Sequence, residues 1–325
     1  MRYVVIGASA AGISGAKTLR ELDKDAEIVL ISKDTEVYSR CILHHYISNH
    51  RNIEKLNFTS KNFFEEYNIS WIKGVEVLEL KDKEKTLNLS NGESIKYDKL
   101  MICSGASAFI PPVEGLREGK NVVGLRNLED AILIKEEAAK VKNVVVLGAG
   151  LVGIDAVSGL IDTGVNITLV EMGDKVLPIQ LDKYASSIYE NKFSEQGVNL
   201  KLGVRAEKLI LDEENNPKAL LINTGEEIPC ELVIVATGVR SNIGFLADSN
   251  IECDRFGLII DEKGKTNIDG VFGAGDVTGR NPIWPTAVKE GIIAAHNMLG
   301  KEMIMTDFFG SKNTMNFVGI ATMSL

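Results

Sequence analysis

Residues 144–153 read VVVLGAGLVG, four apolar residues followed by glycines at Gly148, Gly150 and Gly153. The apolar run is typical of a strand that is buried on both faces. In such a turn the first glycine makes the bend tight, the second lets the backbone approach a pyrophosphate, and the third lets helix and strand pack closely. The N–H groups and the dipole at the start of the helix favour phosphate. The stretch therefore predicts a strand–turn–helix unit that binds a dinucleotide.

A carboxylate follows this turn at the distance expected for a dinucleotide site. Glu171 closes the apolar strand predicted over residues 166–170, about 20 residues after the turn. An acid at this place binds the ribose hydroxyls of NAD and repels the 2′-phosphate of NADP, and no Arg follows directly. The sequence therefore predicts an NADH site, the alternative being a solvated acid at a strand end.

A related stretch opens the chain, where residues 3–12 read YVVIGASAAG. Gly7 and Gly12 match the first and third glycines, Ala11 precedes the third, and Ser9 stands where the second glycine is expected. Serine is small, and the stretch follows a strand and begins a helix, so we predict a second dinucleotide site rather than a chance loop. Two sites imply two nucleotides held at once, with electrons passing between them.

The first unit departs from the pattern at the end of its second strand. The strand predicted over residues 27–31 ends at Ser32, which is followed by Lys33 and Asp34. No acid occupies the place that Glu171 has in the second unit. We therefore include Ser32 and Lys33 among the candidate cofactor contacts, with Ser32 or Asp34 facing the adenosine ribose.

The two units form an internal repeat, because a buried strand and a turn of small residues recur as LMICSG over 100–105 and LVIVATG over 232–238. A Pro-Pro linker at residues 111–112 separates them. The fold class predicted is α/β, with two Rossmann-like, three-layer ββα domains, the second inserted in the first. The first predicted domain covers 1–110 and 241–305, the inserted NAD(H)-binding domain covers 111–240, and residues 306–325 follow as a separate segment.

Composition excludes several classes of protein. The 325 residues suit two domains, and the net charge of −9 argues against binding of nucleic acid, which needs clustered Lys and Arg. Without an apolar run of about 18 residues or a signal peptide, we expect a cytoplasmic protein that does not enter the membrane. The four cysteines have no Cys-x-x-Cys or metal-ligand spacing, so neither a metal nor a structural disulfide is predicted; they are Cys41, Cys103, Cys230 and Cys253.

The order of these motifs, with GAGD at residues 273–276, resembles the pyridine-nucleotide–disulfide oxidoreductase superfamily over nearly the whole chain. The resemblance implies that the domain over 1–110 and 241–305 binds FAD and that 306–325 are the start of a truncated C-terminal interface domain. It also implies that Asp276 binds the ribitol of FAD and that the helix start over residues 284–287, which includes Ala287, directs its N–H groups at the flavin. That orientation suits the stabilisation of charge on a reduced flavin. The remaining cofactor contacts implied by the shared motifs are Ser104, Gly105, Gly238 and Gly275.

Family members diverge at the redox motif, where this chain reads YSRCILHHY over residues 38–46. Cys41 matches the single redox cysteine of NADH oxidases, NADH peroxidases and coenzyme A–disulfide reductases. Tyr38, Arg40 and Leu43 also resemble NADH:rubredoxin reductases, ferredoxin reductases and the flavin part of nitrite reductases, which lack the cysteine. Cys41 is therefore either a redox thiolate or a small residue beside the flavin, and Arg40 is a candidate contact. Ala10, where peroxidases carry a histidine, disfavours peroxidase chemistry.

Two further residues match a pair near the flavin of ferredoxin reductases, where a lysine pairs with a glutamate. His45 and Asp155 stand at those places, and an ion pair would raise the pKa of the histidine. The alternative is that His44 and His45 are ordinary loop residues. Cys41, His45 and Asp155 are the candidate catalytic residues.

The resemblance implies an FAD-dependent NADH oxidoreductase that passes electrons to a rubredoxin or iron–sulfur protein. The alternative is a single-cysteine NADH oxidase or CoA-disulfide-type reductase that uses Cys41. An alternative of another class is a non-catalytic flavin-binding redox sensor. Residues 313–317 look like the beginning of the family's C-terminal domain, and a homodimer is expected only where that domain is present.

Overall fold

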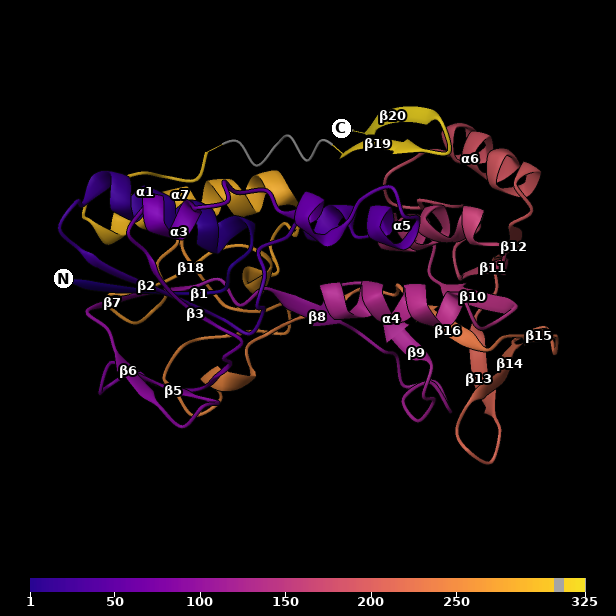
Figure 1. The fold of residues 1–325 in the computed structure, drawn as a ribbon, viewed down its shortest axis with the longest axis horizontal. Helices are drawn as coiled ribbons and strands as arrows, with labels where there is room; N and C mark the ends of the chain where they lie inside the picture. Colours follow the sequence, from indigo (N-terminus) through magenta and orange to yellow (C-terminus); the bar gives the residue numbers. More distant parts are fainter. Residues whose placement is uncertain (307–312, 325) are drawn as a thin grey trace. The chain divides into compact units, whose positions relative to one another are not determined.

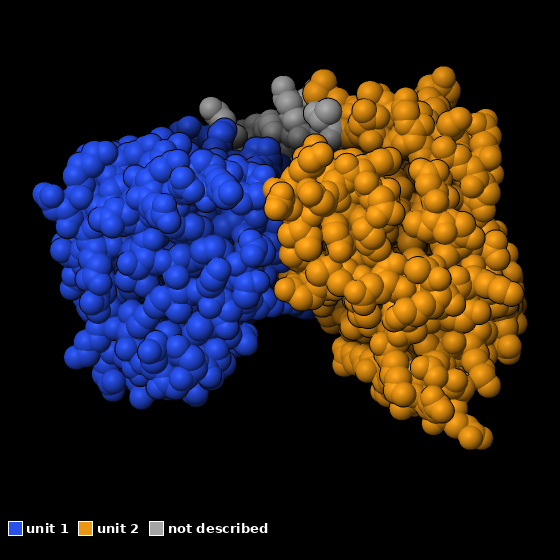
Figure 2. All heavy atoms as spheres, viewed as in Figure 1, with its two compact units in different colours: residues 1–39, 57–107, 240–311 blue, residues 40–56, 108–239, 312–325 orange. Residues whose placement is uncertain are grey.

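The computed structural model describes residues 1–306 and 313–324, and the chain divides into two compact units (Figure 1, Figure 2). Unit 1 comprises residues 1–39, 57–107 and 240–311, and unit 2 comprises residues 40–56, 108–239 and 312–325. Residues 307–312 and 325 of the predicted C-terminal segment lie outside the described residues.

Unit 1 is built on a parallel sheet in the strand order β18-β7-β1-β2-β3. The apolar runs of the sequence form its central strands, because both faces of the sheet are covered. The strands are β1 (Arg2–Ile6), β2 (Glu27–Ser32), β3 (Ser70–Lys73), β7 (Lys99–Ile102) and β18 (Val271–Gly273). Its other elements are α1 (Ala10–Leu22), α3 (Phe63–Glu66), α7 (Trp284–Met298), η4 (Gly244–Leu246), η5 (Asp276–Thr278) and the antiparallel strands β4 (Val77–Lys81), β5 (Thr86–Leu89) and β6 (Ser94–Lys96).

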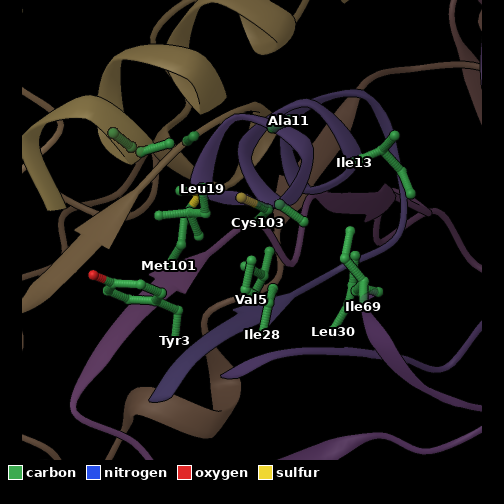
Figure 3. Packing of buried hydrophobic residues seen from close by; sticks show 14 of the residues in the cluster. Tyr3, Val5, Ala11, Ile13, Leu19, Ile28, Leu30, Ile69, Met101 and Cys103 are labelled. Carbon is green, nitrogen blue, oxygen red and sulfur yellow. The ribbon is translucent and has the colours of Figure 1, made fainter. Parts of the chain in front are cut away.

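Helices α1, α3 and α7 cover one face of this sheet, and the β4–β6 sheet lies on the other (Figure 1). Figure 3 shows side chains of α1 over those of β1 and β2 in the core on the helical face. The strands β18, β7 and β1 are parallel neighbours in the sheet, so their carboxyl ends lie side by side. Ligands of open α/β sheets bind outside such strand ends.

Helices α1 and α7 approach each other closely because both carry glycine at the contact. A Cβ at Gly291 would lie 2.2 Å from the carbonyl oxygen of Ala11, and one at Gly15 would lie 3.2 Å from the carbonyl oxygen of Gly291. The start of α1 is thereby held against α7 by backbone atoms. Only residues without a side chain permit this approach.

The Gly291→Ala variant tests this contact. A methyl group placed 2.2 Å from a backbone oxygen must push the helices apart. We expect a loss of about 1–3 kcal/mol in the free energy of unfolding, although alanine favours a helix. Chemical denaturation measures it, with Gly244→Ala as the control, since a Cβ there meets nothing within 4 Å. Equal stability of the two variants would contradict the close approach.

Unit 2 repeats the plan with a parallel sheet in the order β12-β11-β10-β16-β9. Its strands are β9 (Val122–Gly124), β10 (Asn143–Leu147), β11 (Asn166–Glu171), β12 (Asn199–Leu202) and β16 (Leu232–Val235). The antiparallel sheet packed on it consists of β13 (Ala206–Leu211), β14 (Pro217–Ile222) and β15 (Glu227–Pro229). Its helices are η1 (Arg40–Ile42), α2 (His44–Ile47), η2 (Ile53–Leu56), α4 (Leu128–Ala138), α5 (Leu151–Leu160), η3 (Ile161–Thr163) and α6 (Lys183–Glu195).

A hairpin from the C-terminal segment packs on unit 2. It consists of β19 (Asn313–Phe317) and β20 (Ile320–Ser324), paired antiparallel. The hydroxyl of Tyr189 in α6 donates to the carbonyl of Ile320 at 3.0 Å and lies 2.9 Å from the hydroxyl of Thr322. Phe317 is buried beside Tyr189. Short strands β8 (Ala106–Ala108) and β17 (Val239–Ser241) lie where the chain passes from one unit to the other.

The predicted fold class, α/β with two Rossmann-like units, is confirmed by the two parallel sheets. The division differs in detail from the predicted domain boundaries. Residues 40–56 group with unit 2, although the prediction places them in the FAD-binding domain. The physical reason is the packing of α2 against α4 and α5 of unit 2.

Candidate nucleotide sites

The turn after β10 requires glycine at two of its three glycine positions, at one for its backbone conformation and at the other for a close approach. Gly148 has a φ of +100°, and a Cβ there would lie 2.6 Å from the carbonyl oxygen of Ala236. A Cβ at Gly153 would lie 1.8 Å from the carbonyl oxygen of Gly148. Gly150 has a φ of −74°, and a Cβ there would meet nothing within 4 Å. The space in front of Gly150 is the approach that a pyrophosphate would use.

The turn after β1 has the same geometry. Gly7 has a φ of +108°, with its missing Cβ 2.1 Å from the carbonyl oxygen of Cys103. A Cβ at Gly12 would lie 1.8 Å from the carbonyl oxygen of Gly7, as at Gly153. Ser9 begins α1 with a φ of −113°, which any residue adopts. Serine is therefore compatible with the backbone here, because the second glycine of this motif serves the ligand and not the turn.

Glu171 is fastened to the turn of unit 2. Its Oε2 accepts a hydrogen bond from the backbone N–H of Ala149 at 2.7 Å, and its Oε1 accepts one from Gly173 at 2.7 Å. The carboxylate thus links the end of β11 to the glycine turn after β10. Gly238, with a φ of +117°, follows the neighbouring strand β16 at the same edge of the sheet.

The predicted flavin contacts of unit 1 come together at the ends of its strands. A Cβ at Gly275 would lie 3.1 Å from the Cβ of Ala11 and 3.6 Å from that of Ala287. Gly275 has a φ of +82°, and Asp276 follows at the start of η5. Three segments far apart in the sequence, the starts of α1 and α7 and the turn after β18, therefore meet at one place.

Ser104 and Gly105 are hydrogen-bonded to Asn242, which was not among the predicted site residues. The Oγ of Ser104 donates to the carbonyl of Asn242 at 2.8 Å, and the Asn242 amide donates to the carbonyl of Ser104 at 2.9 Å. The N–H of Asn242 also donates to the carbonyl of Gly105. No sequence signal marks Asn242, because its partners lie more than 130 residues away.

Ser32 makes two hydrogen bonds to other residues of unit 1. Its hydroxyl donates to the carbonyl of Asp34 at 2.8 Å and accepts from the indole N–H of Trp71 at 3.0 Å. Asp34 in turn accepts from the hydroxyl of Tyr38, whereas Lys33 is exposed. Ser32 and Asp34 thus fix the conformation after β2, and Lys33 is the residue there that reaches solvent.

Arg40 and Cys41 lie in η1, which belongs to unit 2. The guanidinium of Arg40 donates to the carbonyl of Arg126 at 2.9 Å and to the Oδ1 of Asn127 at 2.7 Å, at the N-terminus of α4. The thiol of Cys41 is exposed. Burial raises the pKa of the buried thiols of Cys103 and Cys230. Partial burial and the nearby Asp254 also raise the pKa of Cys253, which is exposed.

The expected partner of Asp155 is His45, and the structure corrects this to His44. The Nδ1 of His44 lies 3.1 Å from the Oδ1 of Asp155, without the alignment of a hydrogen bond. Adjacent residues of a helix point about 100° apart, so only one of the two histidines in α2 can face α5. His45 lies instead between His44 and His50, with ring centroids 4.1 and 6.1 Å away.

The expectation that this pair raises the histidine pKa is also wrong. Burial, followed by the nearby His45, His50 and Arg51, lowers the pKa of His44 to about 4. Burial raises the pKa of Asp155 well above its usual value. Burial penalises the charged form of both groups, so the environment of the contact disfavours an ion pair.

A further buried carboxyl, Glu290, lies in unit 1 and was not found from the sequence. The residue is 1% exposed, and its Oε2 accepts a hydrogen bond from the backbone N–H of Gly275 at 2.6 Å. Burial raises the pKa of Glu290 to about 7. A glutamate within an amphipathic helix is normally taken for a surface residue, and its contact with a glycine 15 residues earlier has no periodic signal.

Two absences concern residues 1–306 and 313–324. No helix among them is long and apolar enough to cross a bilayer. They also contain no group of three or more His, Cys, Asp and Glu side chains that could hold a metal ion.

Comparison with known proteins gives consistent matches. The model of the family described as "Pyridine nucleotide-disulphide oxidoreductase" matches residues 1–291. An NADH oxidase of Methanocaldococcus jannaschii is 31% identical over 321 residues, covering 93% of this chain and 71% of that protein. The structure of an NAD-dependent persulfide reductase from A. fulgidus has a TM-score of 0.88 at 28% identity, covering 98% of this chain and 62% of that one. The structure of NADH:rubredoxin oxidoreductase from Clostridium acetobutylicum has a TM-score of 0.82 at 25% identity, covering 98% of this chain and 80% of that one.

Proposed function

This chain belongs to the pyridine nucleotide-disulphide oxidoreductase family and is a flavin- and NAD(P)H-dependent oxidoreductase, and on that premise we propose that it oxidises NADH with FAD and delivers electrons to a rubredoxin or iron–sulfur protein. The observation that carries the proposal is the repeated turn: the missing Cβ lies 1.8 Å from a carbonyl oxygen at both Gly12 and Gly153. This repetition supports the proposal of one dinucleotide in each unit.

Unit 1 offers the residues that would hold FAD. The N-terminus of α1, with Gly7, Ser9 and Gly12, would bind the pyrophosphate, and Asp276 would bind the ribitol. The starts of α1 and α7 and the turn at Gly275 meet through small residues, which brings these three segments together at the proposed site. Bound FAD supplies the redox chemistry, accepting a hydride and releasing electrons, while the protein supplies orientation and electrostatics.

Unit 2 offers the residues that would hold NADH. Gly148, Gly150 and Gly153 would receive the pyrophosphate at the start of α5, and Glu171 would bind the adenosine ribose. The two hydrogen bonds from Ala149 and Gly173 fix both oxygens of this carboxylate before any ligand arrives. A fixed negative charge at this place favours NADH over NADPH, because it repels a 2′-phosphate.

The contact of His44 with Asp155 supports a proton-holding role for these two residues. The two atoms lie 3.1 Å apart, and burial lowers the pKa of His44 while it raises that of Asp155, so a proton held by this pair is favoured on the carboxyl over the imidazole. We assign the role to His44 in place of the expected His45. The low pKa of His44 keeps its ring neutral at neutral pH, so it accepts a proton only when a negative charge arrives beside it.

Assay of the purified protein against several acceptors tests the function. NADH oxidation should be fastest with rubredoxin or a ferredoxin, and slow with oxygen alone. The chain spans 62% of the persulfide reductase that it resembles, so a CoA-disulfide and a persulfide belong in the same assay. FAD that stays bound and is not reduced by NADH would instead support the non-catalytic sensor.

The exposed thiol of Cys41 favours a second candidate, a thiol-dependent reductase. The Cys41→Ser variant separates the two. With electrons passing directly to a redox protein, turnover should remain within about twofold of the wild type, since no covalent step uses the thiol. Steady-state rates with rubredoxin measure this, with Cys253→Ser, the other exposed cysteine, as the control. A loss specific to Cys41→Ser would favour the thiol mechanism.

A further inference from the structure

Glu290 is a buried acid at the place where the proposed FAD site of unit 1 converges. Its Oε2 accepts from the N–H of Gly275, the residue before Asp276. The next residue, Gly291, packs against the carbonyl oxygen of Ala11 in the first turn of α1. The carboxyl is therefore hydrogen-bonded to the segment that would hold the ribitol, and its helix α7 packs against the segment that would hold the phosphates.

The second oxygen of this carboxyl has no partner. Oε1 is buried, and within the described part of the chain it makes no hydrogen bond. A buried, ionised carboxylate with an unmatched oxygen is costly, whereas protonation at Oε1 removes the charge and leaves Oε2 as an acceptor. The side chain is thus poised to hold a proton.

The charges around Glu290 act in opposite directions. Asp276, on the segment that follows β18, disfavours its ionisation, and Arg280 on the same segment favours it. From the end of β7 the neighbouring group is the thiol of Cys103, whose pKa is raised by burial and by Glu290. Burial is the largest of the influences on the pKa of Glu290, which lies at about 7. The ionised and protonated forms are therefore both accessible near neutral pH.

We propose that Glu290 is a positioning residue that takes up one proton when FAD binds to unit 1. Without ligand and above neutral pH, the carboxylate is ionised and holds the turn at Gly275. The arrival of the two negative charges of a pyrophosphate at the start of α1 disfavours a second buried negative charge, so the carboxylate binds a proton from solvent. The hydrogen bond to Gly275 is retained in both states because Oε2 remains an acceptor.

This inference rests on the proposed function, because it places FAD in unit 1. Its signature is linkage: above the pKa of Glu290, the affinity for FAD should fall by about tenfold for each pH unit, as one bound proton requires. Below that pKa the affinity should not depend on this group. If Glu290 had a purely structural role, its replacement would lower the affinity for FAD by the same factor at every pH.

Isothermal titration calorimetry of FAD into the protein stripped of flavin, in two buffers of different ionisation enthalpy, measures the proton uptake directly. At about pH 8 the wild type should take up close to one proton per FAD. The Glu290→Gln variant keeps an acceptor for Gly275 and should take up none, with an affinity that does not change with pH. Asp261→Asn is the matched control, an exposed acid of unit 1 that also accepts backbone N–H groups.

The outcomes separate the two proposals. If FAD does not bind, the proposed function fails. If FAD binds to the wild type without proton uptake from about pH 6 to about pH 9, the assignment of Glu290 is overturned, whether or not the variant folds. Equal uptake by wild type and Glu290→Gln would overturn it as well, and would place the proton on another group.

Discussion

Replacement of Gly153 by alanine should abolish reduction by NADH while FAD stays bound, and replacement of Gly12 should release FAD. In each turn the new Cβ would lie 1.8 Å from the carbonyl oxygen of the first glycine, so the turn must open. A backbone clash of about 3 kcal/mol weakens binding by about 100-fold or more. Flavin absorbance after gel filtration measures retained FAD, and anaerobic stopped-flow mixing with NADH measures reduction.

Gly150→Ala is the control that separates the turn from the ligand. Its Cβ would meet no atom within 4 Å and its φ is −74°, so the fold should keep its melting temperature. The added methyl group would still occupy the approach of a pyrophosphate, so NADH should bind more weakly. If Gly153→Ala lost FAD and Gly12→Ala kept it, the assignment of the two nucleotides to the two units would be reversed.

The Glu171→Gln variant should lose most of its preference for NADH over NADPH. The neutral side chain would lack the charge that repels a 2′-phosphate, and its amide would present N–H to one of the two backbone donors, Ala149 or Gly173. We expect the ratio of kcat/KM for NADH to that for NADPH to fall by about 10–100-fold, which corresponds to about 1.4–2.8 kcal/mol. Flavin reduction by both coenzymes in stopped-flow experiments measures the ratio.

Glu231→Gln provides the matched control for this measurement. Glu231 also accepts hydrogen bonds from backbone N–H groups of unit 2, those of Lys142 and Asn143, but at the beginning of β10 instead of its end. Its replacement should affect stability and leave the coenzyme ratio unchanged. A wild-type protein that reacts faster with NADPH would remove the basis for the role of Glu171.

Much of the fold could be predicted because its signals are local. The apolar strands and the glycine turns lie within about ten residues of each other, and the strand, turn and helix over 144–160 have the predicted order. The division of the chain into two units was harder to predict from the sequence. Residues 40–56 group with unit 2 because of packing by α2 that no pattern in the segment announces.

Site residues that lie in a local motif could be predicted from the sequence, whereas those whose contacts depend on distant segments could not. The turn residues were found from their spacing, and the structure explains why Ser9 is compatible with a glycine position. The choice between His44 and His45 depends on which side of a four-residue helix faces α5, and a helix this short has no periodic pattern to show it. Asn242 and Glu290 were missed because their partners are set by strand order and helix packing.

The sequence alone determined that this chain has two dinucleotide turns, because the glycine requirement is a property of the local backbone and is visible in the order of residues. It also determined the acid at Glu171, whose distance from the turn is set by one strand and one helix. Only the tertiary structure decided that His44 contacts Asp155 and that Glu290 accepts a hydrogen bond from Gly275. Those contacts, and the pKa shifts of these residues, depend on burial by segments remote in sequence, which no local pattern records.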